Sequence, residues 1–350
     1  MTQIKRLNKV RETQGTLEPE DEALFRRCDN LVKRLKGLDK RKRSQSEGYD
    51  DVNTFGVLAA EGFLPGYGLE VGSVLGTAEI PYWHTGAREF ALPRPASVAL
   101  REYVPGNLIY ANGHKFVARR FHRDVGEELK DIPVFEVSKE QQAVKSSSFG
   151  AAAGALGSDF LRAIATCDVD LLHQSHISDE EELRFQIGVS IFGLELDRDE
   201  GGRALKWGAQ PVHRRRGVHL RLVNVGATKR MEQQGTLGYP VCTVCGSSVS
   251  PLSSKRQLEQ FDQSHLERCG VKVEPTGFYA DVVADVLQLP GCMDQRAAYS
   301  ALESLRMAAT HVLDMHMEDL QLLVIGHVDR PDVDAYLWDP MPGGSGLLDQ

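Results

Sequence analysis

The first apolar pattern along the chain has helical spacing. The segment 18–38 begins with Pro19 and three acidic residues that follow it, and this composition favours the first turn of a helix. The apolar side chains then recur every three or four positions and share one face. They are Leu24, Phe25, Cys28, Leu31, Val32, Leu35 and Leu38. Because a polar and basic run at 39–48 ends the pattern, we expect residues 1–48 to form a helical linker or docking segment.

Short apolar runs broken by Gly and Pro follow, and they predict strands. Residues 49–137 are expected to form a β-rich unit in which the Asn112-Gly113 pair makes a hairpin turn. A small and polar stretch at 138–158 predicts a hinge. Strands expected near 184–196 and 217–227 make residues 138–235 a second β-rich unit.

The most regular helical pattern lies near the end of the chain, at 293–315, with Asp294 as its expected N-cap. Its small and aliphatic residues form one continuous face that suits close packing. They are Ala297, Ala298, Ala301, Leu302, Leu305, Ala308, Ala309, Val312 and Leu313. Two apolar runs after it predict strands, so residues 293–350 are expected to be a helix packed on terminal strands. The fold class that these patterns predict is α+β.

The charge of the chain limits the classes of partner that it can bind. A formal net charge of −8 argues against a protein that coats nucleic acid over its whole surface. Two local basic clusters are candidate phosphate contacts; they are Arg214, Arg215 and Arg216, and Lys40, Arg41, Lys42 and Arg43. A charged strand edge for the first cluster and a solvated linker for the second are the alternatives.

Nothing in the sequence indicates a membrane protein. No run of about 18 apolar residues occurs, and the first residues lack the apolar stretch of a signal peptide. We therefore expect a cytoplasmic protein. In that reducing compartment, a close cysteine pair indicates metal or redox chemistry more often than a structural disulfide.

A metal site is predicted in residues 236–292. Cys242 and Cys245 are separated by two residues on an expected turn, which is the arrangement of zinc knuckles. Downstream, Ser253 or Ser254 as N-cap and Gly270 as a stop delimit an expected helix that places His265 and Cys269 one turn apart on one face. The predicted ligands of a structural Zn²⁺ are Cys242, Cys245, His265 and Cys269.

Three alternatives remain for these cysteines. A redox Cys-x-x-Cys pair requires a helix that begins at the motif, whereas Gly246 and a run of serines follow here. Cys292 is a second candidate for the fourth ligand. An accidental match to this spacing is the remaining interpretation.

No motif of an enzyme appears. The GxxxxGK[ST] phosphate loop, the GxSxG nucleophile turn and the HExxH helix are all absent from the sequence. We therefore expect no enzymatic activity from this chain alone.

Seven segments occur in an order that resembles a known family. They are GFLPGY (62–67), the run at 92–116, LVNVG with GYPVCTVCG (222–246), FDQSHLERCG (261–270), ADVLQL (284–289), the Ala-rich helix, and YLWDPMPGGSG (336–346). Together they are similar to the helicase-associated C-terminal domain of MrfA-type DEAD/DEAH-box DNA helicases and of DrmB, a subunit of the DISARM phage-defence system. The resemblance covers roughly residues 55–350.

The resemblance implies a zinc-containing accessory module of a superfamily 2 helicase system, acting on DNA in repair or in phage defence. It also implies a zinc site at 242, 245, 265 and 269. The motor domains and a further cysteine-rich segment of that family are absent, which predicts a separate subunit or part of a longer ATP-dependent helicase. The implied partners are a DEAD/DEAH-box motor and DNA. A scaffold that binds only the helicase subunit is the alternative, and a nuclease with dispersed carboxylates is a weaker one.

Overall fold

The structure is a computed structural model, and it describes residues 74–81, 89–122, 132–138, 140–147, 160–178, 184–196, 202–208, 210–226, 237–292, 294–327, 331–341 and 344–349. The chain divides into two units, Met1–Gly72 and Ser73–Gln350, and all described residues belong to the second. The helix expected at 18–38 and the basic cluster from Lys40 to Arg43 lie outside the described residues.

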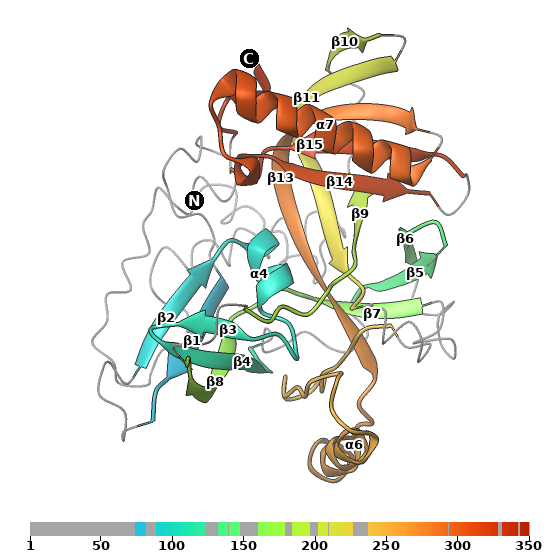
Figure 1. The fold of residues 1–350 in the computed structure, drawn as a ribbon. Helices are drawn as coiled ribbons and strands as arrows, with labels where there is room; N and C mark the ends of the chain where they lie inside the picture. The colour runs from blue at the N-terminus through green and yellow to red at the C-terminus, as the bar shows by residue number, and fades with distance from the viewer. Residues whose placement is uncertain are drawn as a thin grey trace, which may run out of the picture. The chain divides into compact units, whose positions relative to one another are not determined.

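Strands dominate the described residues, with a few helices between them, so the α+β prediction is confirmed (Figure 1). The strands are β1 (Val74–Glu79), β2 (Glu89–Arg94), β3 (Ile109–Ala111), β4 (His114–Phe121), β5 (Val134–Ser138), β6 (Ala143–Ser147), β7 (Phe160–Ala165), β8 (Val169–His176), β9 (Ile191–Glu195), β10 (Arg203–Trp207), β11 (Gln210–Asn224), β12 (Tyr239–Pro240), β13 (Pro275–Cys292), β14 (Gln321–Gly326) and β15 (Val333–Trp338). The helices are α4 (Ala96–Glu102), α6 (Lys255–Cys269) and α7 (Gln295–Leu313), with 3-10 turns η3 (Met317–Asp319) and η4 (Leu347–Asp349). None of the helices within the described ranges is both long and apolar enough to cross a membrane.

The first sheet has the strand order β2-β1-β8-β4-β3. β3 and β4 form the expected hairpin, because Asn112 (φ 48°) and Gly113 (φ 78°) both adopt the left-handed backbone that a two-residue hairpin turn requires. β8 lies in the middle of the sheet, parallel to β1 and antiparallel to β4.

The second sheet is organised around its two long strands, β11 and β13. Its main order is β10-β11-β13-β7-β5-β6, with β9 on β11, β12 and β15 on β13, and β14 on β15. β13 is 18 residues long; α6 precedes its first residue and α7 follows its last (Figure 1). Both sheets draw strands from 49–137 and from 138–235, because β5 belongs to the second sheet and β8 to the first.

One apolar core joins the two sheets. It contains Phe116 and Leu171 from the first sheet, Leu100 from α4, and Leu222 and Phe278 from the second sheet. These side chains are at most 4% exposed, so the short helix α4 fills the space between the sheets instead of lying on the surface.

α7 packs against the second sheet with a narrower face than the sequence pattern predicts. Asp294 caps the helix as expected, because its side chain accepts a hydrogen bond from the Arg296 amide. Ala298 and Leu302 are fully buried against β14 and β15, whereas Val312 is 80% exposed. The prediction that Val312 belongs to the packed face is therefore wrong, and so it is for Ala297 and Ala308, which are also exposed. A straight helix on a sheet buries only the side chains nearest the contact line.

Candidate metal centre

Cys242 and Cys245 lie on a tight turn that directly follows β12. The Cys242 amide donates to the Ser247 carbonyl at 2.8 Å, and the Gly246 amide donates to the Cys242 carbonyl at 2.8 Å. Val241 and Ser248 form an antiparallel bridge that closes the turn. We call residues 241–248 the knuckle. These hydrogen bonds fix the backbone from which both thiols project, with Cys242 buried and Cys245 half-buried.

The knuckle is attached to the first sheet through β4. The Phe121 amide donates to the Gly246 carbonyl at 2.8 Å, and the Ser248 amide donates to the Arg119 carbonyl at 2.9 Å. Gly246 has a φ of 72°, and a β-carbon there would lie 1.9 Å from the Phe121 carbonyl oxygen. Only glycine fits a backbone this close. No sequence pattern indicates this role of Gly246, because Phe121 is far from it along the chain.

α6 supplies the second half of the site, and its predicted ends are confirmed. Ser254 accepts a hydrogen bond from the Gln257 amide in a capping box, and Gly270 ends the helix with a left-handed φ of 69°. His265 and Cys269 are therefore four residues apart on one helix, and side chains with this spacing lie on the same face.

The fold brings the knuckle and α6 together. The ligand atoms of Cys242, Cys245 and His265 all lie within 4.8 Å of one another. Ligands of a tetrahedral zinc ion, bound at about 2.0 to 2.3 Å, are separated by roughly 3.3 to 3.8 Å. These three residues are therefore close enough to bind one metal ion.

His265 shows which atom would face the ion. Its ring is 2% exposed, and Nδ1 lies 2.8 Å from the Phe261 carbonyl oxygen, to which an Nδ1–H can donate. Among the described residues Nε2 is buried and has no hydrogen-bond partner. A buried ring nitrogen without a partner is destabilising, and a metal ion would satisfy it. Donation from one ring nitrogen to a carbonyl, with the other on the metal, is the usual arrangement of a zinc-bound histidine.

Cys269 is not in the group whose ligand atoms all lie within 4.8 Å of one another, but its thiol interacts with those of Cys245 and Cys242. Desolvation and contacts with the thiols of Cys245 and Cys242 raise the pKa of Cys269 to about 11. Desolvation opposes ionisation of Cys245, but hydrogen bonds from Ser247 and contacts with Cys242 and Cys269 lower the pKa of Cys245 to about 6. A group of thiols such as this one is a donor set suited to a soft or borderline cation.

The structure weighs against two of the alternatives for these cysteines. No helix begins at the knuckle, since α6 starts only at Lys255, so the structural context of a redox Cys-x-x-Cys pair is missing. Cys292 is wrong as a replacement ligand. It ends β13 and packs beside α7, roughly 50 Å of extended strand from Thr276, where β13 pairs with β12. None of the five cysteines that the structure describes forms a disulfide.

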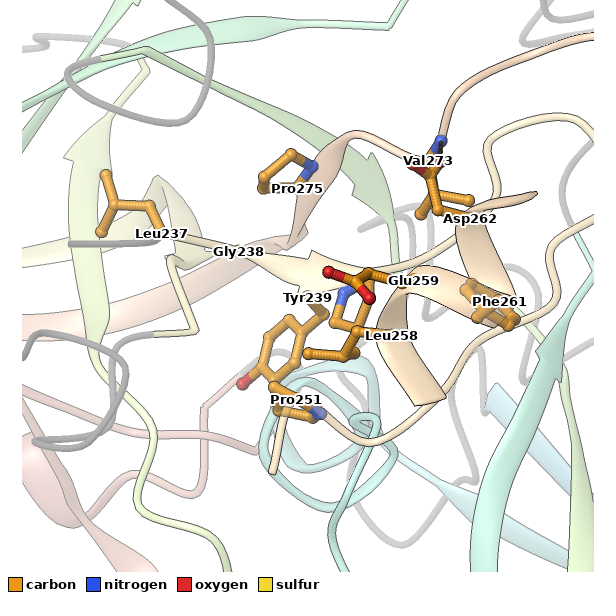
Figure 2. A pocket seen from close by; sticks show the side chains of 11 residues that line it. Leu237, Gly238, Tyr239, Pro251, Leu258, Glu259, Phe261, Asp262, Val273 and Pro275 are labelled. Carbon is orange, nitrogen blue, oxygen red and sulfur yellow. Dashed lines mark hydrogen bonds between the residues drawn. The ribbon is translucent and has the colours of Figure 1, made fainter. Parts of the chain in front are cut away.

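A pocket of about 300 Å³ lies beside the metal centre, between α6 and the strands that flank it. Its walls are mostly apolar, and Figure 2 shows the Glu259 carboxylate directed toward the space that they enclose. The lining residues are Leu237, Gly238, Tyr239, Pro240, Pro251, Leu258, Glu259, Phe261, Asp262, Val273 and Pro275. This composition suits an apolar group that carries a positive charge. No sequence pattern indicates this pocket, because folding assembles it from four separate segments.

The arginine cluster at 214–216 is mostly engaged inside the fold. Arg214 is 8% exposed and pairs with Asp285 at 3.1 Å and Asp349 at 2.7 Å. Arg215 is 7% exposed and pairs with Glu195 at 2.6 Å. These positions weigh against phosphate contact by Arg214 and Arg215.

Arg216 differs from its two neighbours. Its side chain is 69% exposed, although it pairs with Asp349 at 2.8 Å. The alternative of a charged strand edge does not hold at Arg214, where β11 lies between β10 and β13, but it stays open for Arg216, which lies in the register shift of β11 between Arg215 and Val218. DNA contact by this cluster stays a prediction that depends mainly on Arg216.

No protein-family model matches the chain, and no curated protein matches it. A solved structure of the DUF1998 helicase MrfA bound to DNA is similar over 91% of this chain, with 8% sequence identity and a TM-score of 0.32. This chain spans about a third (32%) of the length of that protein. A likeness at this identity and TM-score establishes neither a common fold nor a common function.

Proposed function

We propose that this chain is a zinc-containing accessory module of a superfamily 2 DNA helicase system. One observation supports the zinc assignment: Cys242, Cys245 and His265 converge, and the buried Nε2 of His265 has no other partner among the described residues. Cys269 is the proposed fourth ligand. Four protein ligands complete a tetrahedral zinc site and leave no position for substrate or water, so the ion would be structural.

The position of the site suggests what the ion would stabilise. The knuckle is hydrogen-bonded to β4 of the first sheet, whereas α6 leads directly into β13 of the second. β12, which precedes the knuckle, also pairs with β13. An ion held by the knuckle and α6 would therefore tie together the segment that connects the two sheets.

The helicase assignment depends on the ordered resemblance of seven sequence segments to the helicase-associated C-terminal domain. A module of this kind would lack its own ATPase motor and would support DNA engagement and assembly with a DEAD/DEAH-box motor. The process would be DNA repair or phage defence of the DISARM type.

Elemental analysis of the purified chain tests the zinc assignment. We expect about one zinc per chain, lost in Cys245→Ser and in His265→Ala. Cys292→Ser is the matched control, because that thiol is also half-buried and lies outside the site. Absence of zinc from the native chain, or equal zinc content in Cys245→Ser and Cys292→Ser, would rule the assignment out.

A scaffold that binds only the helicase subunit is the second candidate. The net charge of −8 and the burial of Arg214 and Arg215 favour it, because both reduce the cationic surface available to phosphates. Binding to single-stranded and forked DNA at two salt concentrations distinguishes the two functions. A DNA-engaging module loses affinity steeply with salt, whereas the scaffold shows no binding at either concentration.

Variants localise any DNA contact. If Arg216 contacts a phosphate, Arg216→Gln should lower the salt-dependence slope by about one. Neutralising Lys40, Arg41, Lys42 and Arg43 together should lower it by up to about four. Arg296→Gln is the control, since Arg296 is an exposed cation on α7 outside both clusters. Equal slopes in all variants would remove both clusters from the proposed interface.

A further inference from the structure

Three of the histidines in the first sheet lie next to one another, away from the cysteine site. His114 begins β4, and His173 and His176 lie in the last part of β8. Nδ1 of His114 is 2.9 Å from Nε2 of His173. The ring centre of His114 lies 5.0 Å from that of His173 and 5.0 Å from that of His176.

A β-bulge places the three side chains on the same face. His173 and His176 are three positions apart, and residues with this spacing on a regular strand face opposite sides. The register shifts between Lys115 and Phe116 of β4, so that His114 lies opposite His176 and Phe116 lies opposite His173. His114 and Phe116 lie on the same face of β4. The residues opposite them on β8, His176 and His173, therefore lie on that face of the sheet as well. Bulges that redirect a side chain in this way are frequent beside functional sites.

Two of the ring separations match shared coordination of one ion. The three histidines as they stand do not place one ring nitrogen each within 4.8 Å of the others, so binding requires the His176 ring to turn. With bonds of about 2.0 to 2.1 Å, two imidazoles on a tetrahedral ion have coordinating nitrogens about 3.3 Å apart and ring centres about 5 Å apart. The observed ring separations of 5.0 Å agree, and the nitrogen separation of 2.9 Å needs only slight widening. His176 is exposed, so its ring can rotate to bring a nitrogen to the same point.

The surroundings combine a rigid base with access from solvent. His114 is 5% exposed, and the Phe116 ring lies 5.6 Å from that of His173 and 5.6 Å from that of Phe90. This apolar support fixes the inner rings, while exposed His176 leaves the outer side open to water. His114 and Phe121, which binds the knuckle, are at opposite ends of β4, roughly 20 Å apart.

We propose that His114, His173 and His176 form a second metal site, separate from the cysteine site, for a late first-row divalent cation such as Zn²⁺, Ni²⁺ or Cu²⁺. Imidazole ligands suit these cations. Three protein ligands on a tetrahedral ion leave one position to water or another small ligand, so this site differs from the closed cysteine site.

Calorimetric titration with Ni²⁺ tests the proposal on the zinc-loaded chain, which here means the chain carrying one equivalent of zinc, at the closed cysteine site. We expect one additional equivalent to bind, with affinity at least ~10-fold weaker in His173→Ala and in His176→Ala. His311→Ala is the control, because His311 is an exposed histidine on α7. The affinity of this variant for Ni²⁺ should equal that of the native chain. His176 is at the surface, so His176→Ala keeps the test valid if His173→Ala fails to fold.

A Co²⁺ titration of the zinc-loaded chain shows where the additional ion binds. The added ion should lack the sulfur-to-metal charge-transfer band that cysteine ligands produce. Three results would overturn the proposal: no additional equivalent in the native chain, unchanged affinity in both histidine variants, or a charge-transfer band from the added ion. If the native chain binds no Ni²⁺ and His173→Ala lowers the thermal stability, the three histidines have a purely structural role.

Discussion

A β-carbon on Gly246 would lie 1.9 Å from the carbonyl oxygen of Phe121, so the knuckle and β4 are in backbone contact with no room for a side chain. The contact includes the hydrogen bond from the Phe121 amide to the Gly246 carbonyl. Correct placement of the two cysteines therefore depends on a strand outside the ligand-bearing segment.

Gly246→Ala should destabilise the chain and reduce its zinc content, because the added methyl forces the knuckle away from β4. We expect a loss of more than about 2 kcal/mol in the free energy of unfolding, from the clash together with the left-handed backbone. Gly270→Ala is the matched control: Gly270 has a similar φ of 69°, but no atom lies within 4 Å of its added β-carbon. Gly270→Ala should lower the free energy of unfolding by only about 1 to 2 kcal/mol. Equal losses in the two variants would show that the contact with Phe121 is unimportant.

Removal of the metal by a chelator should loosen α6 and the knuckle before the rest of the chain. Structural zinc contributes roughly 10 kcal/mol or more of apparent binding energy to the segment that it organises. Hydrogen exchange should therefore accelerate in residues 238–270, while the amides shared by β11 and β13 remain protected. Zn²⁺ should restore protection and Mg²⁺ should not. Unchanged exchange in 238–270 would contradict a structural role for the ion.

Glu195→Ala should destabilise the second sheet strongly. Its carboxylate accepts from Arg215 at 2.6 Å and from the Tyr336 hydroxyl at 2.7 Å, and Arg215 is 7% exposed. Loss of one partner leaves a buried charge uncompensated, at a cost of about 3 to 5 kcal/mol.

The control for Glu195→Ala is a pair at the surface. Glu303→Ala removes the partner of Arg306 on α7, where the carboxylate is 45% exposed. Such a pair contributes at most about 1 kcal/mol. Urea denaturation measures both variants, and a similar small loss in each would mean that the buried network around Arg215 is not needed for folding.

Leu302→Ala and Val312→Ala compare the two faces of α7. Leu302 is fully buried in the cluster between α7, β14 and β15, so its truncation should cost about 2 to 5 kcal/mol. Val312 is 80% exposed, so Val312→Ala should change stability by less than about 0.5 kcal/mol. A large loss in Val312→Ala would indicate that a partner or another part of the chain covers that face.

Features that depend on neighbouring residues could be predicted from the amino-acid sequence alone. The ends of α6 follow from Ser254, Gln257 and Gly270, whose hydrogen bonds and backbone angles lie within the helix or next to it. The hairpin at Asn112 and Gly113 follows for the same reason. The two pairs of candidate ligands could likewise be proposed from the sequence, since the spacing of two residues on a turn and of two residues one helical turn apart is local.

Contacts between distant segments became known only from the folded chain. Arg214 and Arg215 form a basic run in the sequence, but their carboxylate partners lie on other strands, at Asp285 and Glu195, and folding buries them together. The alignment of His173 with His176 depends on a bulge in the pairing of β8 with β4. Hydrogen bonding and side-chain periodicity act over a few residues, whereas burial and register depend on the packing of the whole core.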